Sequence, residues 1–240
     1  TEVEIKVTGL ISRSAVTQHF KNPTDKWLEG TYVFPLPDTA AVDELSMKIG
    51  ERIIVGEIEE RAQAKKIYKK AKSEGKKATL VEQERPSIFT TSVANIGPGE
   101  TIQITIEYQE VLRYDAGGFQ LRFPTVVGPR YIPGTRKITK FSGTGWAHNT
   151  DEVADASRVT PPVAHPDTGP INPVRIRAHI NAGFPANVQS PSHAVRTHED
   201  STGIMVTLAE KVVPADSDFV LEWRPKVGDA PGAALFSDVF

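Results

Sequence analysis

Short segments in which apolar and polar residues alternate recur along the chain, and this pattern limits the fold more than any other feature. The clearest case is residues 101–108, where Ile102, Ile104, Ile106 and Tyr108 alternate with polar residues. Successive side chains of a β-strand point to opposite faces of a sheet, so these four residues would share one face. The same pattern predicts strands at residues 3–7, 174–180 and 204–208.

Glycine and proline separate these segments, as is typical of a β-rich chain. The 240 residues include 18 glycines and 18 prolines, together 15% of the chain, which is somewhat above the combined share of about 12% in average proteins. Alternation of this kind belongs to antiparallel sheets that keep one face in water. The sequence therefore predicts a mainly β fold, an antiparallel β-sandwich. Further strands are expected at about residues 11–20, 30–36, 42–49, 52–58, 79–83, 87–95, 119–123 and 218–224.

One segment, residues 59–75, has the spacing of a helix. Its apolar residues recur at helical intervals, at Ala64, Ile67, Tyr68 and Ala71. Glutamates at its start and lysines toward its end suit the helix dipole, and a glycine closes the segment as helices commonly require. We expect one amphipathic α-helix at about 59–75 that packs on the sandwich through Ile67, Tyr68 and Ala71.

Proline and glycine are dense in residues 134–172, where no periodicity persists. A structureless connection this long is uncommon inside a compact domain, so we interpret it as a crossover or linker with a short hairpin at residues 137–141. It divides the chain into a β-sandwich over residues 1–133 and a β-rich C-terminal segment over residues 173–240. The two β parts can share one core, because short β segments bury too little apolar surface alone.

Charge and composition exclude several classes of protein. The 28 Lys and Arg residues against 30 Asp and Glu give a net charge of −2, whereas nucleic-acid binders need a basic surplus. No run approaches the roughly 18 consecutive apolar residues of a membrane span. Cysteine is absent, which excludes disulfides, cysteine-ligated metals and cysteine nucleophiles. We therefore expect no nucleic-acid partner and no transmembrane segment in these residues.

No motif in the chain points to a metal, a cofactor or catalysis. Asp155 and Ser157 begin an Asp-x-Ser-x-Ser pattern, but Val159 occupies its last position. Asp151, Glu152 and Asp155 form a small acidic group that would suit calcium, although an ordered calcium loop follows a much stricter pattern. We interpret these carboxylates as solvated loop charges, and we expect no metal, cofactor or catalytic residue.

The histidine and serine patterns likewise indicate no metal site and no catalytic site. His-Glu-x-x-His and Gly-x-Ser-x-Gly are both absent, and the Gly-Thr-Gly of residues 143–145 precedes no predicted helix. Ser190 and Ser192 precede His193 and predict a turn capped by serine hydroxyls. A triad assembled only in space leaves no motif, so a hydrolase remains the least favoured alternative. The six histidines are His19, His148, His165, His179, His193 and His198.

The predicted helix is strongly basic. Residues 59–77 contain eight basic and three acidic side chains. Such a surface can attract a sulfated glycan, an anionic surface or an acidic protein. Alternatively, the lysine stems cover the sheet while their ammonium groups stay in water. The candidate binding residues of helix 61–77 are Lys65, Lys66, Lys69, Lys70 and Lys72.

The order of many residues over the first 133 positions resembles the VIT domain (vault protein inter-alpha-trypsin domain). The matching positions are 18–22, 29–37, 40–42, Ala62, Tyr68, Ala71, Gly75, Ala78, Leu80, Glu82, Gln83, Phe89, Val93, 95–100, Tyr108, Leu112 and 129–131. Residues 190–193, 218–223 and 233–236 resemble the segment that joins VIT to a von Willebrand factor type A domain. That second resemblance is to bacterial surface proteins, including the marine proteobacterial sortase-target type.

These resemblances imply a non-catalytic interaction or scaffold module of an exported bacterial protein, extracellular or at the cell surface and concerned with adhesion. The implied partner is a type A domain of the same chain, which would carry the metal-dependent ligand site and begin soon after Phe240. An extracellular protein or glycan ligand is also implied. The runner-up hypothesis is direct binding of an anionic glycan or protein through the basic helix.

Overall fold

The computed structural model describes residues 1–126, 132–136, 145–160 and 173–226. The first half contains β1 (Glu2–Thr8), β2 (Ile11–Lys21), β3 (Leu28–Pro35), β4 (Ala41–Ile49), β5 (Arg52–Val55), α1 (Arg61–Ser73), β6 (Ala78–Arg85), β7 (Ile88–Ile96), β8 (Thr101–Val111), β9 (Arg113–Asp115) and β10 (Gly118–Phe123). The second half contains α2 (Ala156–Val159), β11 (Arg175–Asn181), β12 (Ala186–Gln189), β13 (Val195–Asp200), β14 (Gly203–Leu208) and β15 (Phe219–Pro225).

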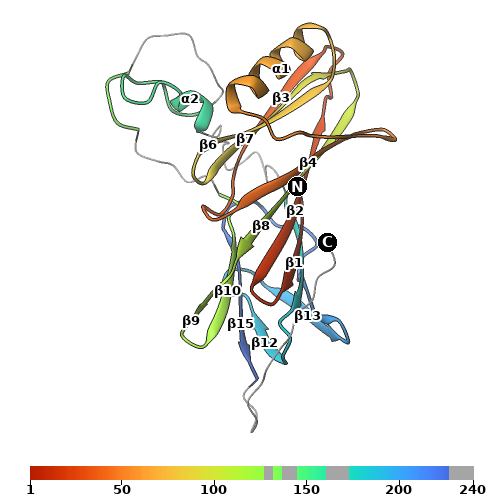
Figure 1. Cartoon of the computed structure of the whole chain (residues 1–240), viewed down its shortest axis with the longest axis vertical. Coiled ribbons are helices and arrows are strands. Elements are labelled where there is room, and N and C mark those ends of the chain that lie inside the picture. Colours follow the sequence, from red (N-terminus) through yellow and green to blue (C-terminus); the bar gives the residue numbers. More distant parts are fainter. Residues whose placement is uncertain (127–131, 137–144, 161–172, 227–240) are drawn as a thin grey trace.

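The strands form three sheets. The largest has eight strands in the order β13-β14-β11-β1-β2-β8-β4-β5, the second is β12-β15-β10-β9, and the third is β3-β7-β6. Figure 1 shows an elongated molecule with α1 and the three-stranded sheet at the upper end and the four-stranded sheet at the lower end. The predicted mainly β fold with one amphipathic helix is confirmed.

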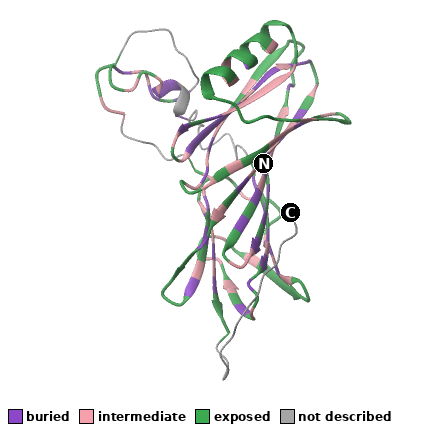
Figure 2. Cartoon of the chain, in the orientation of Figure 1, coloured by how far each residue is buried: buried purple, intermediate pink, exposed green. Residues whose placement is uncertain are grey.

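One hydrophobic core joins the three sheets. Val3 of β1, Phe34 of β3 and Trp223 of β15 belong to the same cluster of buried residues. On β8, Ile102, Ile104 and Ile106 are completely buried, and the residues between them lie toward the surface. Figure 2 shows this alternation of buried and more exposed positions along the strands. The sidedness that the sequence pattern predicts for β8 is therefore confirmed.

The strands after residue 173 enter the same sheets as the strands before residue 123. β11 pairs in parallel with β1, from Arg175 opposite Glu2 to Asn181 opposite Thr8, while the other pairings among the described strands are antiparallel. β15 pairs with β10 in the four-stranded sheet. Sharing sheets lets short strands from both ends of the chain bury apolar surface that neither could cover alone.

Helix α1 is shorter than predicted, because Arg61–Ser73 replaces the expected 59–75. Glu60 caps its start, and its carboxylate accepts a hydrogen bond of 3.2 Å from the backbone N–H of Ala62. Tyr68 is buried as expected, with 8% of its surface exposed, but Ile67 is 48% exposed. The prediction that Ile67 packs on the sheet is therefore wrong, because adjacent residues of an α-helix point about 100° apart and Ile67 lies off the face that buries Tyr68.

The described part of the proline-rich segment forms a small lobe that contains α2. The Thr150 hydroxyl donates to the Pro133 carbonyl at 2.6 Å and accepts from the N–H of Val153 at 2.9 Å. The hairpin predicted at residues 137–141 lies outside the described residues. Within the residues that the structure describes, no helix is long and apolar enough to span a bilayer.

Candidate functional site

Ion pairs attach the basic side of α1 to the three-stranded sheet. Arg61 contacts both Glu82, at 3.1 Å, and Glu84, at 2.6 Å, and Lys65 contacts Glu82 at 2.9 Å. The side chains of Glu82 and Glu84 are 8% and 0% exposed, so these pairs exclude much of the surrounding water. At the other end of the helix, Lys72 contacts Glu29 of β3 at 2.6 Å.

Tyr68 joins the Lys72–Glu29 contact. Its hydroxyl donates to Oε1 of Glu29 at 2.7 Å, while Lys72 donates to Oε2. Burial alone would raise the pKa of Glu29, but the hydrogen bonds from Lys72 and Tyr68 outweigh it and hold the pKa below its ordinary value. Burial and the Glu29 charge both raise the pKa of Tyr68, which therefore stays protonated as a donor.

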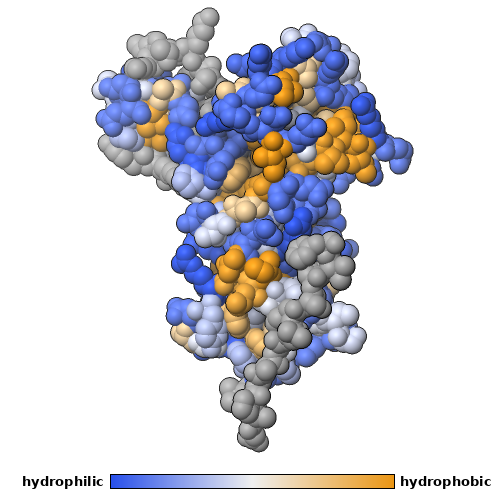
Figure 3. All heavy atoms as spheres, in the orientation of Figure 1, coloured by the Kyte–Doolittle hydropathy of each residue, from blue (hydrophilic) through white to orange (hydrophobic). Residues whose placement is uncertain are grey.

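Three of the five candidate lysines remain available on α1. Lys66, Lys69 and Lys70 are exposed and make no ion pair with the described residues, whereas Lys65 and Lys72 hold carboxylates of the sheet. Figure 3 shows hydrophilic side chains over most of the helix surface in this view. The predicted basic patch therefore consists of two lysines that attach α1 to the sheet, Lys65 and Lys72, and three solvated lysines.

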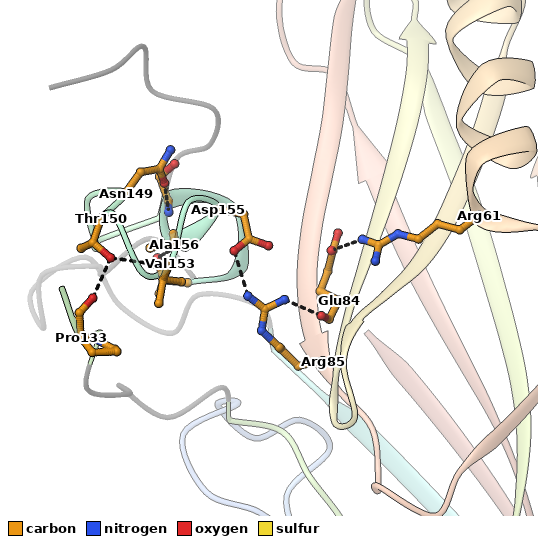
Figure 4. Close-up of polar contacts among 11 residues, drawn as sticks. Arg61, Glu84, Arg85, Pro133, Asn149, Thr150, Val153, Asp155 and Ala156 are labelled. Carbon is orange, nitrogen blue, oxygen red and sulfur yellow. Dashed lines mark hydrogen bonds and ion pairs between the residues drawn. The ribbon is translucent and has the colours of Figure 1, made fainter. Parts of the chain in front are cut away.

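The acidic residues considered for calcium serve the small lobe instead. Asp151 accepts a hydrogen bond of 2.6 Å from the Thr135 N–H. Asp155 accepts one of 2.8 Å from Arg85, whose other guanidinium nitrogen donates to the Glu84 carbonyl at 2.6 Å (Figure 4). Across the described ranges, no group of three His, Asp or Glu residues is arranged to hold a metal ion.

The serine-capped turn predicted before His193 is confirmed. Ser190 Oγ accepts from the His193 N–H at 3.2 Å and donates to the Val220 carbonyl at 2.6 Å. The His193 ring nitrogen Nδ1 lies 2.9 Å from Ser192 Oγ, and the ring packs 5.6 Å from that of Phe219. This geometry gives His193 a structural role at the end of β12. His165 and residues 143–144 lie outside the described residues.

A cavity of about 520 Å³, which the sequence did not reveal, opens where the three sheets meet. Three buried apolar side chains form its floor, namely Ile88 of β7 and, from the connections that follow β3 and β8, Leu36 and Leu112. Its polar lining comprises Asp38, Thr39, Ser87, Glu110, Arg113, Gln120, Arg122 and Asp218. A concave site with an apolar floor and a few polar groups is the usual form of a binding pocket.

Glu110 is the unusual member of this lining. Burial, and then the charge of Asp38, raise its pKa from 4.5 to about 7. Glu110 makes no hydrogen bond or ion pair with the described residues, whereas Arg122 is held by Asp218 at 2.6 Å. A perturbed carboxyl in a cavity is a recognised marker of a functional site, so this pocket is the candidate site.

A signal in the sequence could have revealed Glu110. The alternation that places Ile102, Ile104, Ile106 and Tyr108 on the core face of β8 continues to position 110. A carboxylate in that series must enter the core side of the sheet, where solvation is poor. The strand segment predicted from the alternation, residues 101–108, ends two positions before Glu110.

Three curated proteins are each similar to about half of the chain. The protein mono-ADP-ribosyltransferase PARP4 of Mus musculus is 34% identical over 130 residues, which are 54% of this chain and 6% of that protein. The von Willebrand factor A domain-containing protein 5A of Homo sapiens is 31% identical over 133 residues, 54% of this chain and 17% of that protein. The inter-alpha-trypsin inhibitor heavy chain H3 of Pongo abelii is 32% identical over 123 residues, which are 50% of this chain and 14% of that protein.

The chain thus spans no more than 17% of the length of these three relatives. Among solved structures, a protein of Legionella pneumophila aligns over 92% of this chain and 64% of its own, with a TM-score of 0.48 and 8% identity. That likeness is too weak to indicate a shared function. Residues 1–108 match the family described as the vault protein inter-alpha-trypsin domain. The first 108 residues of this chain thus match the VIT domain family, and about half of the chain is similar to part of each of the three curated proteins.

Proposed function

We propose that this chain is a non-catalytic module that positions a von Willebrand factor type A domain of the same protein, in an exported bacterial protein at the cell surface. The name of one relative supports the pairing, since it is a von Willebrand factor A domain-containing protein. The type A domain would contribute the cation and the ligand contact. The VIT module would set the orientation of that domain.

The observation that carries this proposal is the edge of the largest sheet. Among the described strands, β5 ends the strand order and pairs only with β4, and its Ile53 and Val55 are 64% and 65% exposed. An edge strand with exposed apolar side chains is a surface that another polypeptide normally covers. Figure 3 shows hydrophobic patches on a surface that is otherwise mostly hydrophilic. An adjoining domain of the same protein would cover this edge at the highest effective concentration.

The absence of cysteine in the chain gives a direct test. A spin label at Lys69→Cys and another in the type A domain of the full-length protein should give one narrow distance distribution. Val55→Lys should broaden that distribution, whereas Val212→Lys, at another exposed valine that lies outside β5, should leave it unchanged. A broad distribution in the unmodified protein, or a full-length gene product without a type A domain, would refute the positioning role.

A second candidate function is binding of an anionic glycan or acidic protein through α1, which the exposed Lys66, Lys69 and Lys70 favour. Heparin is a suitable probe, and its affinity should fall steeply with salt if these charges bind it. Changing the three lysines to glutamine should abolish retention on a heparin column. The same substitution at Lys6, Lys48 and Lys211 is the matched control for net charge.

The proposed location at the cell surface needs its own test. Intact cells of the source organism, treated with a protease that does not enter them, should lose the full-length protein. A cytosolic marker enzyme in the same cells should survive. Protection of the protein until the cells are lysed would contradict an exposed location.

A further inference from the structure

The cavity where the three sheets meet contains a negative charge that no described residue neutralises. Glu110 continues the core-facing series of β8, and Asp38 lines the same cavity from the β3–β4 connection. The Glu110 side chain is half-buried and makes no hydrogen bond or ion pair with the described residues. A poorly solvated carboxylate without a partner is costly, so it favours a ligand that supplies hydrogen-bond donors.

The positive charges near the cavity do not meet this need. Arg122 is engaged by Asp218, through contacts of 2.6 and 2.8 Å. Arg113 is exposed at the mouth, and neither arginine lowers the pKa of Glu110. The other titratable group on the same face is Tyr108, whose own pKa is raised by burial and by the Glu110 charge. Proton donors for the carboxylate must therefore come from solvent or from a bound molecule.

The floor of the cavity indicates the kind of molecule. Leu36, Ile88 and Leu112 are between 1% and 5% exposed, and they line the same cavity as Glu110. An arginine or lysine side chain has an apolar stem that suits such a floor and a cationic end that suits a carboxylate. A divalent cation would instead need several oxygen ligands around it, and the described residues offer no such cluster.

We propose that this cavity is a docking site for a basic side chain, arginine or lysine, of another polypeptide segment, with Glu110 as its principal acceptor and Asp38 at the rim. The guanidinium or ammonium group donates hydrogen bonds to the carboxylate, and the stem lies on the apolar floor. This site does not depend on the positioning function proposed above, because it would accept a basic residue from any partner of suitable shape.

The test uses Nα-acetyl-arginine amide and its uncharged isostere Nα-acetyl-citrulline amide. In a titration followed by ¹H–¹⁵N NMR at pH 8, the arginine probe should shift the amide signals of Leu36, Asp38, Thr39 and residues 110–113, and the citrulline probe should bind at least about tenfold more weakly. Glu110→Gln should weaken arginine binding by about tenfold or more. The matched control is Glu107→Gln, which lies on the same strand but on its outer face, paired with Arg13 at 2.9 Å.

A change of pH provides a second test that needs no variant. With the pKa of Glu110 at about 7, the ionised fraction falls from about 90% at pH 8 to about 10% at pH 6. Affinity for the arginine probe should therefore fall about tenfold over this range. Equal binding of arginine and citrulline, unchanged affinity in Glu110→Gln, or shifts of the same signals by calcium chloride alone would each overturn the proposal.

Discussion

Replacing Glu110 by glutamine should stabilise the protein above neutral pH. Glutamine keeps the size of the side chain and removes the negative charge that the core side of β8 solvates poorly. The folded state currently has to hold this carboxylate beside Asp38 without a cation from the described residues. Removing the charge of Glu110 should therefore raise the free energy of unfolding, whereas most substitutions on the core side of a strand lower it.

The size of the effect follows from the change in pKa. A rise from 4.5 to about 7 corresponds to about 3 kcal/mol between the folded and unfolded states. Glu110 is only half-buried, so solvent screening reduces the expected cost of the charged form to about 1–2 kcal/mol. The free energy of unfolding of Glu110→Gln should exceed that of the unmodified protein by this amount at pH 8.

The sign of the pH dependence is equally specific. Between pH 4.5 and 7 the folded protein binds more protons at Glu110 than the unfolded chain, so its stability falls as the pH rises through this window. Above pH 7 the carboxyl is ionised in both states and the difference is constant. Urea unfolding at pH 4.5, 6 and 8 should show the advantage of Glu110→Gln growing from near zero to its full value.

Glu107→Gln is the control for this experiment. Its carboxylate faces outward and pairs with Arg13, so its loss should destabilise by less than about 1 kcal/mol at every pH above 5. If Glu110→Gln were less stable than the unmodified protein at pH 8, the carboxylate would have a favourable partner and the reasoning on the cavity would be wrong. An advantage that did not change with pH would refute the electrostatic origin.

Three further results are expected. Tyr68→Ala should lower the free energy of unfolding by about 3 kcal/mol because it removes a buried aromatic ring, whereas Ile67→Ala should cost no more than about 0.5 kcal/mol; equal losses would refute the observed helical phase. Asn95→Ala should lower the free energy of unfolding by about 2 kcal/mol, because Asn95 has a φ of +57° and its side-chain amide donates to the carbonyls of Lys72 and Lys76. Asn95→Gly should lower it by less, because glycine tolerates this backbone conformation. Thermal melts with and without EDTA should coincide, and a midpoint several degrees lower with EDTA would reveal a structural metal.

Sequence periodicity predicted which side of β1, β8, β11 and β14 enters the core. The series from Ile102 to Tyr108 on β8 is buried as the alternation requires, and Tyr68 is the buried residue of α1. Such sidedness is a local property, because the direction of each side chain follows from the repeat of the strand or helix alone. The resemblance to the VIT domain was also visible in the order of residues, and the family match over residues 1–108 agrees with it.

Which strands pair with each other, and which charged side chains meet, was decided only by the tertiary structure. The parallel pairing of β1 with β11 joins residues more than 170 positions apart, and no pattern within either strand specifies that partner. Lys65 and Lys72 looked like members of one basic patch, yet they pair with Glu82 and Glu29 because α1 lies on the sheet that carries these glutamates. The cavity at Glu110 likewise exists only where three sheets meet. Local repeats determine the face of a residue, whereas the neighbours on that face, and hence charge compensation and solvation, depend on contacts between distant segments.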